Sequence, residues 1–182
     1  MLTSEPLVAS AESVDAAKTY LRLDSDEDDA VIASLVVSAT AQAESFTNSV
    51  QVARIFAETV EGGGTWTNLS AWPVVAVTSV ATLDGVPLVI GSYETDIRTD
   101  GVGRVRLTGP VAGVGAGVGA QRVRVSYQAG RAASWTAIAE PVRHGIVRLV
   151  AHHYEPRDRN DGGGLPAAVA VLWRGARRMV LS

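Results

Sequence analysis

The stretch WPVVAVTSVATLDGVPLVIGSYETDI, residues 72–97, lies between two parts of this 182-residue sequence that have helical spacing. It is rich in β-branched residues, which favour strands, and Asp84-Gly85 near its middle is a strong signal for a hairpin turn. The same β character extends over residues 50–130. The pattern predicts an α+β fold, in which this antiparallel β region is inserted into a helical core.

Two helices are expected before the β region and one after it. Ser13, ahead of VDAAKTYLRL, is the expected N-cap of the first helix. The acidic run DSDEDD precedes the second, where the helix macrodipole favours negative charge. Pro141 opens the third, because proline suits the first helical turn. The helical core is therefore expected over residues 13–49 and 138–160, within a single domain of residues 1–182.

Two segments of the β region alternate between polar and apolar residues, as half-buried strands do. In RVRLT and RVRVSY the outward positions include four arginines, namely Arg104, Arg106, Arg122 and Arg124. The connection between the two segments, residues 109–121, is uncharged and rich in glycine, valine and alanine. It is interpreted either as a hairpin tip or as a loop that orders against a neighbouring subunit.

Composition excludes several kinds of chemistry. The chain has no cysteine, which excludes disulfides, zinc–thiolate sites and thiol catalysis. The N-terminus lacks the basic start and apolar run of a signal peptide. No apolar stretch approaches the roughly 20 residues expected of a membrane-spanning helix. These features predict a cytoplasmic protein.

The net charge of −3 is unevenly distributed along the chain. Residues 1–50 hold nine acidic side chains against two basic ones, whereas residues 131–182 hold eight arginines against four acids. An acidic front and a basic end suit copies that pack side by side with opposite ends touching. The alternative is that each end has its own solvated surface.

The segment AHHYEPRDR, residues 151–159, holds two of the three histidines and a glutamate. His153 continues the apolar face of the third helix and is expected in the core, while the spacing of His152 to Arg148 and Glu155 suits surface ion pairing. Adjacent side chains diverge by roughly 100° on a helix, so these histidines do not readily share a metal ion. A structural role is favoured over a metal hydrolase, and the chain lacks HExxH and GxSxG motifs.

The basic end also allows a nucleic-acid interface. Arg174, Arg177 and Arg178 lie close to Trp173 in the sequence, and arginine beside an aromatic residue can bind phosphates and stack on bases. The overall charge is negative, however, and arginine also suits protein interfaces. Protein contact is favoured over nucleic acid.

Several blocks, in order, resemble the head–tail connector (adaptor) family of long-tailed phages and phage-derived gene transfer agents. The blocks are SVDAAKTYLRLDSDEDDAVIASLVVSATAQAESFT, WPVVAVTSVATLDGVPLVIGSYE, YQAGRAASWTAIAEPVRHGIVRLVAHHYEPRD and the tail LPAAVAVLWRGARRM. Together they cover most of residues 13–178. The sequence departs from the family at GPVAGVGAGVGAQ.

The resemblance implies a structural protein that is not an enzyme and needs no cofactor. Such proteins form a ring, usually of twelve copies, below the portal of a DNA-filled head. The ring extends the channel for double-stranded DNA, without sequence-specific binding, and carries the stopper or tail-completion protein. The implied location is the neck of a virion or phage-like particle, assembled in the bacterial cytoplasm.

Residues 165–182 are then expected to dock on the portal. Trp173 is the expected buried anchor, with Arg174, Arg177 and Arg178 as polar contacts. Deleting this segment is expected to leave the domain folded and to abolish portal binding. The four strand arginines are expected to face a neighbouring subunit or the channel. The alternatives are a stopper or tail-completion protein, and a small nucleic-acid-binding module.

Overall fold

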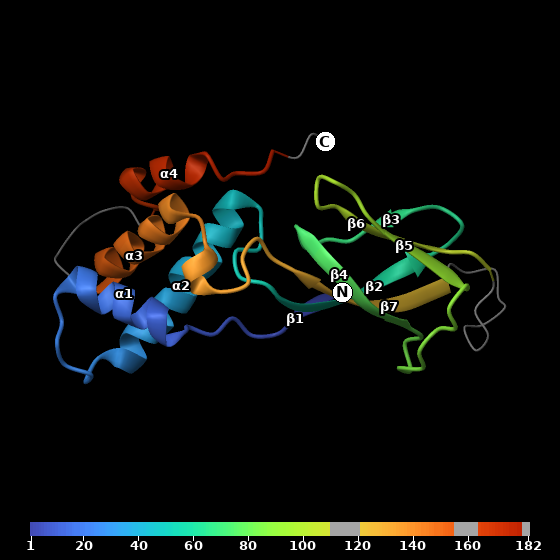
Figure 1. The fold of residues 1–182 in the computed structure, drawn as a ribbon, viewed down its shortest axis with the longest axis horizontal. Coiled ribbons are helices and arrows are strands. Elements are labelled where there is room, and N and C mark those ends of the chain that lie inside the picture. Colours follow the sequence, from blue (N-terminus) through green and yellow to red (C-terminus); the bar gives the residue numbers. More distant parts are fainter. Residues whose placement is uncertain (110–120, 155–163, 180–182) are drawn as a thin grey trace. The chain divides into compact units, whose positions relative to one another are not determined.

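The computed structural model of this chain describes residues 1–109, 121–154 and 164–179. Figure 1 labels its helices and strands. In chain order they are β1 (Leu2–Ser4), α1 (Ala11–Leu21), α2 (Asp29–Thr47), β2 (Arg54–Gly62), β3 (Thr67–Asn68), β4 (Val74–Ala81), β5 (Tyr93–Ile97), β6 (Gly103–Leu107), β7 (Gln121–Ala129), η1 (Trp135–Ala137), α3 (Glu140–Tyr154) and α4 (Ala167–Arg174).

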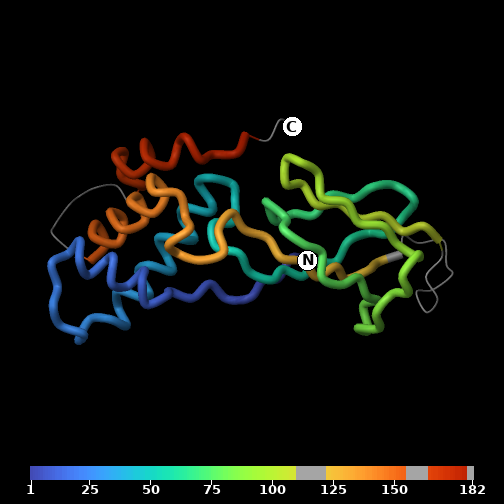
Figure 2. The backbone as a smooth tube through the Cα atoms, in the orientation of Figure 1, coloured from blue at the N-terminus to red at the C-terminus, as the bar shows by residue number. Residues whose placement is uncertain are grey.

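The chain forms two compact units, each built from separate stretches of sequence. The helical unit comprises Pro6–Val52 and Ala132–Ser182, and the sheet unit comprises Met1–Glu5 and Ala53–Arg131. The chain passes between them three times, as the tube in Figure 2 shows. Helices in one unit and antiparallel sheets in the other confirm the predicted α+β fold class.

The core of the helical unit lies where α2 packs on α3, with α1 and α4 against them. Apolar side chains at helical spacing fill it, as the sequence predicted. From α2 and α3, the fully buried members are Ile32, Val36, Ala39, Ala43, Val142, Ile146, Leu149 and Val150. The two helices from distant parts of the sequence therefore form one core.

By length and composition α2 could also cross a membrane, contrary to the sequence-based expectation. Core helices pass the same test, and the buried face of α2 packs on α3.

Ser10, and not Ser13, caps α1. The Ser13 backbone N–H donates to the Ser10 Oγ at 3.3 Å, and the Ser13 hydroxyl donates to the Ser10 carbonyl at 2.6 Å. Ser10 has the extended backbone of an N-cap, whereas Ser13 is already helical and buried. Either serine suits a cap from sequence alone, so the helix begins earlier than predicted.

The acidic run before α2 ties three helices together. Lys18 of α1 pairs with Asp26 at 2.5 Å and with Asp29 at 2.8 Å. Tyr154, the last residue of α3, donates its hydroxyl to Asp28 Oδ2 at 2.5 Å. The hydrogen bond to Asp28 raises the pKa of Tyr154. These acids thus hold α1 and α3 at the start of α2, besides complementing its dipole.

The end of α2 holds two of the three segments that connect the units, the one before β2 and the one after β7. The Gln51 amide nitrogen donates to the Thr47 hydroxyl at 2.9 Å and to the Ser49 hydroxyl at 2.8 Å, with all three side chains buried. The Ala132 N–H donates to the Gln51 carbonyl at 3.0 Å, and Val52 forms a β-bridge with Ala132. The departing and returning chains are thereby joined inside the helical unit.

The sheet unit contains two antiparallel sheets, one ordered β1-β2-β7-β4 and the other β3-β6-β5. The strands β6 and β7 were expected to flank a hairpin tip, but they lie in different sheets. β7 pairs with β2 on one edge and β4 on the other, so neither edge is open to β6. Residues 110–120 of the connection lie outside the described residues.

The turn predicted at Asp84-Gly85 is confirmed. Gly85 has φ of +87°, a left-handed conformation that glycine adopts at little cost. The Thr82 N–H donates to the Val86 carbonyl at 2.8 Å across the turn. The return strand is short, because the chain leaves after Leu88 to form β5 in the other sheet.

Glu58 is the centre of a polar network inside the sheet unit. Its side chain is buried, and it accepts hydrogen bonds from the Ser70 N–H at 2.8 Å, the Ser70 hydroxyl at 2.6 Å and the Tyr127 hydroxyl at 3.1 Å. Tyr127 in turn accepts from the Ala71 N–H at 3.0 Å. Burial raises the pKa of Tyr127, so its hydroxyl stays neutral and able to donate. The network ties the segment after β3 to β2 and β7.

Candidate interaction surfaces

Trp173 lies in the core of its own helical unit, and this differs from its predicted role as a portal anchor. Its side chain is fully buried, its indole N–H donates to the Val142 carbonyl at 3.1 Å, and its ring contacts Phe46 at 5.9 Å between centroids. Trp173 therefore fixes α4 on α2 and α3. Deletion of residues 165–182 would remove this core residue, so the deleted chain is not expected to keep an intact fold.

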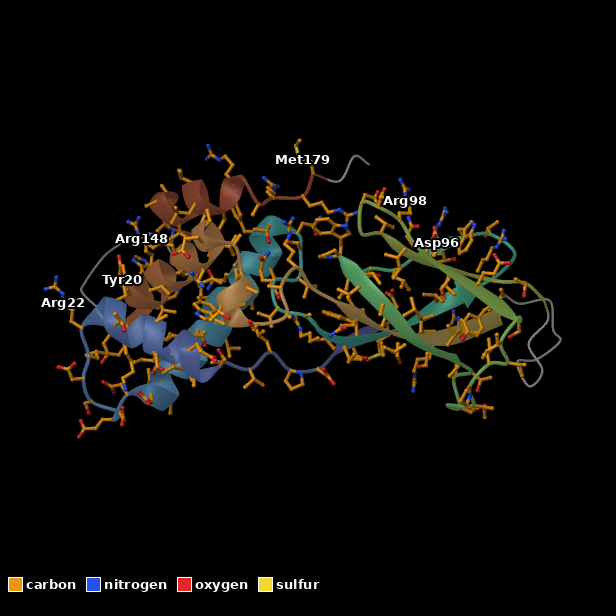
Figure 3. The ribbon with its side chains drawn as sticks, in the orientation of Figure 1. Tyr20, Arg22, Asp96, Arg98, Arg148 and Met179 are labelled. Carbon is orange, nitrogen blue, oxygen red and sulfur yellow. The ribbon has the colours of Figure 1, made fainter. Side chains whose placement is uncertain are left out.

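The packing of Trp173 also determines the positions of the three C-terminal arginines. Arg174 ends α4 and is exposed. Arg177 stacks its guanidinium over Phe46, 5.8 Å from the ring centroid, and the Arg178 N–H donates to the Thr47 carbonyl at 2.9 Å, at the C-terminal end of α2. Met179 projects from the segment and is 87% exposed (Figure 3). One side of the segment is thus bound to its own chain while the other is open.

Arg104 and Arg106 form a compact cluster with Trp66 on the β3-β6-β5 sheet. Their guanidinium carbons lie 4.6 and 4.7 Å from the Trp66 ring centroid. Each also pairs at 2.7 Å with a carboxylate across the strand pair, Arg104 with Asp96 and Arg106 with Glu94. The positive charge expected at a subunit or channel face is neutralised locally. Acids alternate along β5, in YETDI, as arginines alternate along β6. These matching alternations are the sequence signal from which the ion pairs could have been predicted.

Arg122 and Arg124 lie on the other sheet, in β7. Arg122 approaches Glu61 of β2 at 3.5 Å, and both side chains are largely exposed, so the pair contributes little stability. Arg124 is exposed and has no ion pair with any residue that the structure describes. The four arginines therefore form two separate pairs on different sheets, and the β7 pair is the less neutralised of the two.

His153 is exposed, so its predicted place in the core is wrong. The buried stripe of α3 ends at Val150, and the last turn extends past the core. The His152 and His153 rings lie 5.5 Å apart between centroids, tilted by 58° to each other. Desolvation and the neighbouring His152 lower the pKa of His153. The described residues contain no cluster of three metal-ligating side chains, and Glu155 lies outside them.

A pocket of about 370 Å³ lies among α1, α3 and the start of α4. Tyr20, Arg148 and His152 supply its polar groups, and Figure 3 shows Tyr20 and Arg148 at the same end of the helical unit. Arg148 makes no ion pair with the described residues. Arginine and imidazole groups together favour a carboxylate or phosphate group.

The sequence matches no protein-family model and no curated protein. Solved structures do match. A chain in the neck of an empty gene transfer agent (GTA) particle, computed with C6 symmetry, aligns with a TM-score of 0.76 and 23% identity, over 100% of this chain and 97% of that one.

Two further structures align over the same shares of both chains. They are the virion of a native GTA particle, with a TM-score of 0.70 and 23% identity, and the neck of a native GTA particle computed with C12 symmetry, with 0.69 and 21%. This chain therefore shares its fold, from end to end, with chains of the neck and virion of gene transfer agent particles.

Proposed function

We propose that this chain is a structural adaptor in the neck of a tailed phage or gene transfer agent. Copies form a ring, of twelve by analogy with the C12 neck, that lies under the portal, extends the DNA channel and joins the head to the tail. The observation that carries the proposal is the fold likeness to GTA neck and virion chains over the whole length of this one. The proposed role needs surfaces for assembly and requires no catalytic group or cofactor.

The charge distribution supports assembly in a ring. A ring needs two different, complementary surfaces on each copy, because a contact of one patch with itself stops at two copies. The N-terminal 50 residues are strongly acidic and the last 52 are basic. Opposite charges at different parts of each chain favour head-to-tail contacts over symmetric pairs.

The open side of the C-terminal segment is the proposed portal contact. Trp173 holds α4 in place from within, and α4 then presents Val171, 63% exposed, and Arg174. Met179 extends the same segment. An apolar side chain beside arginines is a composition common at protein interfaces. Docking on the portal therefore uses Arg174 with the exposed Val171 and Met179, while Trp173, Arg177 and Arg178 support the segment from its own unit.

Among the strand arginines, Arg122 and Arg124 are the better candidates for a neighbouring subunit or the channel. Arg124 is exposed without an ion pair among the described residues, and Arg122 is 61% exposed and only loosely paired with Glu61, at 3.5 Å. Arg104 and Arg106 are less exposed and pair with carboxylates of their own sheet at 2.7 Å. Arginines on a channel wall act on DNA through its phosphates without reading its sequence. In this proposal, DNA passes through the channel without sequence-specific binding.

Native mass spectrometry of the full chain, alone and mixed with its candidate portal, tests the function. The adaptor function predicts a complex in which copies of 19.0 kDa add to the portal as a complete ring. Binding to an adaptor ring in place of the portal would instead identify a stopper or tail-completion protein. A chain that binds neither, and binds DNA with an affinity that falls steeply with salt, would favour a nucleic-acid module.

Two variants refine the portal contact without removing the core. Arg174→Glu combined with Met179→Glu changes only the open side of the segment, so the chain should fold normally and lose portal binding. The matched control is Val31→Glu, an exposed position on α2 that is 52% accessible. Equal loss in both would mean a general effect of added negative charge.

A further inference from the structure

The pocket among α1, α3 and the start of α4 shares no residue with the proposed portal contact. Its volume of about 370 Å³ leaves room for a side chain from outside. Tyr20 of α1 and Arg148 of α3 line it from the same end of the helical unit (Figure 3), together with His152. None of the described residues that line it is acidic. We call it the Arg148 pocket.

The Arg148 pocket offers positive charge and hydrogen-bond donors to an anion. Arg148 is half-buried and makes no ion pair with the described residues. The start of α4 adds to it, because Pro166 stands at the N-cap position and has no side-chain acceptor for the first N–H groups. The N–H of Ala168, which lines the pocket, has no acceptor among the described residues. The helix dipole there also favours negative charge, although Arg148 is the main attraction.

Two histidines extend this chemistry along α3. His144, Arg148 and His152 are spaced by four residues, which places them on one face of the helix. The Tyr20 ring meets the His144 ring edge-on, with 6.3 Å between centroids, so α1 borders the same face. A guanidinium binds a carboxylate through two parallel hydrogen bonds, and an imidazole or phenol beside it can donate another. The pocket therefore suits the carboxylate of an acidic side chain.

The acidic run before α2 contains one side chain that is open to such a contact. Three acids of the run are already held by side chains of α1 and α3. Asp24 lies in a shallow hollow that Lys18 and Arg22 also line. Glu27 is exposed and makes no ion pair with the described residues, and its backbone N–H donates to the Ser25 hydroxyl at 3.2 Å. Glu27 is thus the acid of this run that remains available to a partner.

We propose that Glu27 of one copy enters the Arg148 pocket of the next copy. The inference rests on the proposed ring, in which each copy needs two different surfaces that complement each other. Glu27 belongs to the acidic N-terminal part of the chain and the pocket to its basic C-terminal part. An arginine and a glutamate that find no opposite charge among the described residues of their own chain thereby find one in the neighbour. Arg148 binds the carboxylate, while Tyr20 and His152 donate to it from the sides.

The ion pair is one part of a larger subunit interface, and it acts mainly on which surfaces meet. Stable interfaces bury about 800 Å² on each partner, which one side chain does not supply. Charge pairs favour the correct contact and disfavour contacts that bring like charges together. Here the like-charge contacts are those of two pockets or of two acidic runs, which would stop assembly at two copies. Added salt should weaken the contribution of this pair, because both partners are open to solvent before they meet.

Two charge reversals, alone and mixed, test the contact on the full-length chain. Arg148→Glu reverses the pocket and Glu27→Arg reverses the acid. Alone, each variant brings like charges together and should self-associate at least about tenfold more weakly than the wild type. Mixed, each pocket meets an opposite charge on the other variant, so the mixture should form rings of alternating copies. Native mass spectrometry and sedimentation at low salt, with and without the portal protein, measure the assemblies.

Matched controls separate this contact from a general effect of charge. Arg98→Glu and Asp15→Arg make the same changes of charge at other exposed positions, and they and their mixture should assemble as the wild type does. Glu155→Gln with Asp158→Asn removes two acids that lie outside the described residues, and this chain should also assemble normally. Thermal unfolding should show that every variant folds. Glu27 is exposed, so its reversal should keep the fold even if that of Arg148 does not.

Normal rings from either single reversal would overturn the contact and leave the adaptor function standing. A mixture that assembles no better than its components has the same meaning. Loss of assembly on removing the acids at 155 and 158 would assign the pocket to acids of its own chain and would also overturn the inference. So would loss of portal binding with ring formation unchanged, which would assign the pocket to the portal. A wild-type chain that never assembles, alone or on the portal, would overturn the contact and the proposed function together.

Discussion

Gly145 of α3 and Trp173 of α4 fit together so closely that only glycine allows the contact. A Cβ atom built at Gly145 would lie 2.2 Å from the indole Nε1, well inside van der Waals distance. The missing side chain makes a notch in α3 for the indole, whose N–H then reaches the Val142 carbonyl. This pair determines where the C-terminal helix lies, and with it which of its residues remain open to a partner.

Gly145→Ala should therefore destabilise the helical unit. The added methyl group displaces the indole, and overpacking of this kind costs about 1–3 kcal/mol. Urea unfolding followed by circular dichroism measures the loss. Gly175→Ala is the matched control, because nothing lies within 4 Å of that position and its backbone is helical. Equal midpoints for the two variants would show that α4 adjusts without cost.

Tyr127→Phe should destabilise the sheet unit. The change leaves the Ala71 N–H without its acceptor and removes one donor from the buried Glu58 carboxylate. An unsatisfied buried group costs about 1–3 kcal/mol. Tyr93→Phe is the control, because the Tyr93 hydroxyl makes no hydrogen bond with the described residues. A Tyr127→Phe variant as stable as Tyr93→Phe would mean that water replaces the lost hydroxyl.

Lys18→Gln should flatten the dependence of stability on pH. The hydrogen bond from Lys18 lowers the pKa of Asp26 below its ordinary value of 3.8, and Asp26 and then Asp29 raise the pKa of Lys18 above 10.5. The Asp26 contribution is present above 3.8 and is lost as the pH falls through its lowered pKa. The Lys18 contribution is present below 10.5 and is lost as the pH rises through its raised pKa.

Urea midpoints of the wild type and Lys18→Gln, compared from acid to alkaline pH, measure this effect. The difference between them should be largest near neutral pH and should shrink at both extremes. It should be modest, because the Asp26 side chain is 87% exposed and solvent screens it. A difference that is constant with pH would mean that Lys18 acts through packing alone.

His153 should titrate below its ordinary pKa of 6.5 in an NMR experiment. Desolvation is the larger cause of the lowered pKa and the charge of His152 the smaller, so His152→Gln should move it only part of the way back. The sign also predicts a small loss of stability as the pH falls from 6.5 through the lowered pKa. Titration of His153 at or above 6.5 would contradict this description of the end of α3.

Local patterns in the sequence predicted individual helices, strands and turns better than they predicted which strands pair. The helical spacing of Ile32 and Val36, and the turn at Asp84-Gly85, depend on neighbouring residues and were predicted correctly. Strand pairing depends on residues far apart in the sequence. The alternation in β6 and β7 therefore revealed two strands without showing that they belong to different sheets.

The candidate surfaces were harder to predict for the same reason. Trp173 and three arginines near the end of a chain suggest an exposed contact, and only Gly145, far away in the sequence, shows that the indole is inside. Arg104 and Arg106 suggest positive charge until the acids of β5 are aligned against them. In both places, the residue that determines whether the side chain is open to a partner lies in a different helix or strand.

The bridge between Val52 and Ala132 has a consequence for how this chain can be re-engineered. The helical unit joins the two ends of the intervening segment by itself, through this bridge and the Ala132–Gln51 hydrogen bond. The helical unit therefore holds Val52 and Ala132 side by side without help from the segment between them. A graft made between residues 52 and 132 would test whether the helical unit still folds when a different segment connects them.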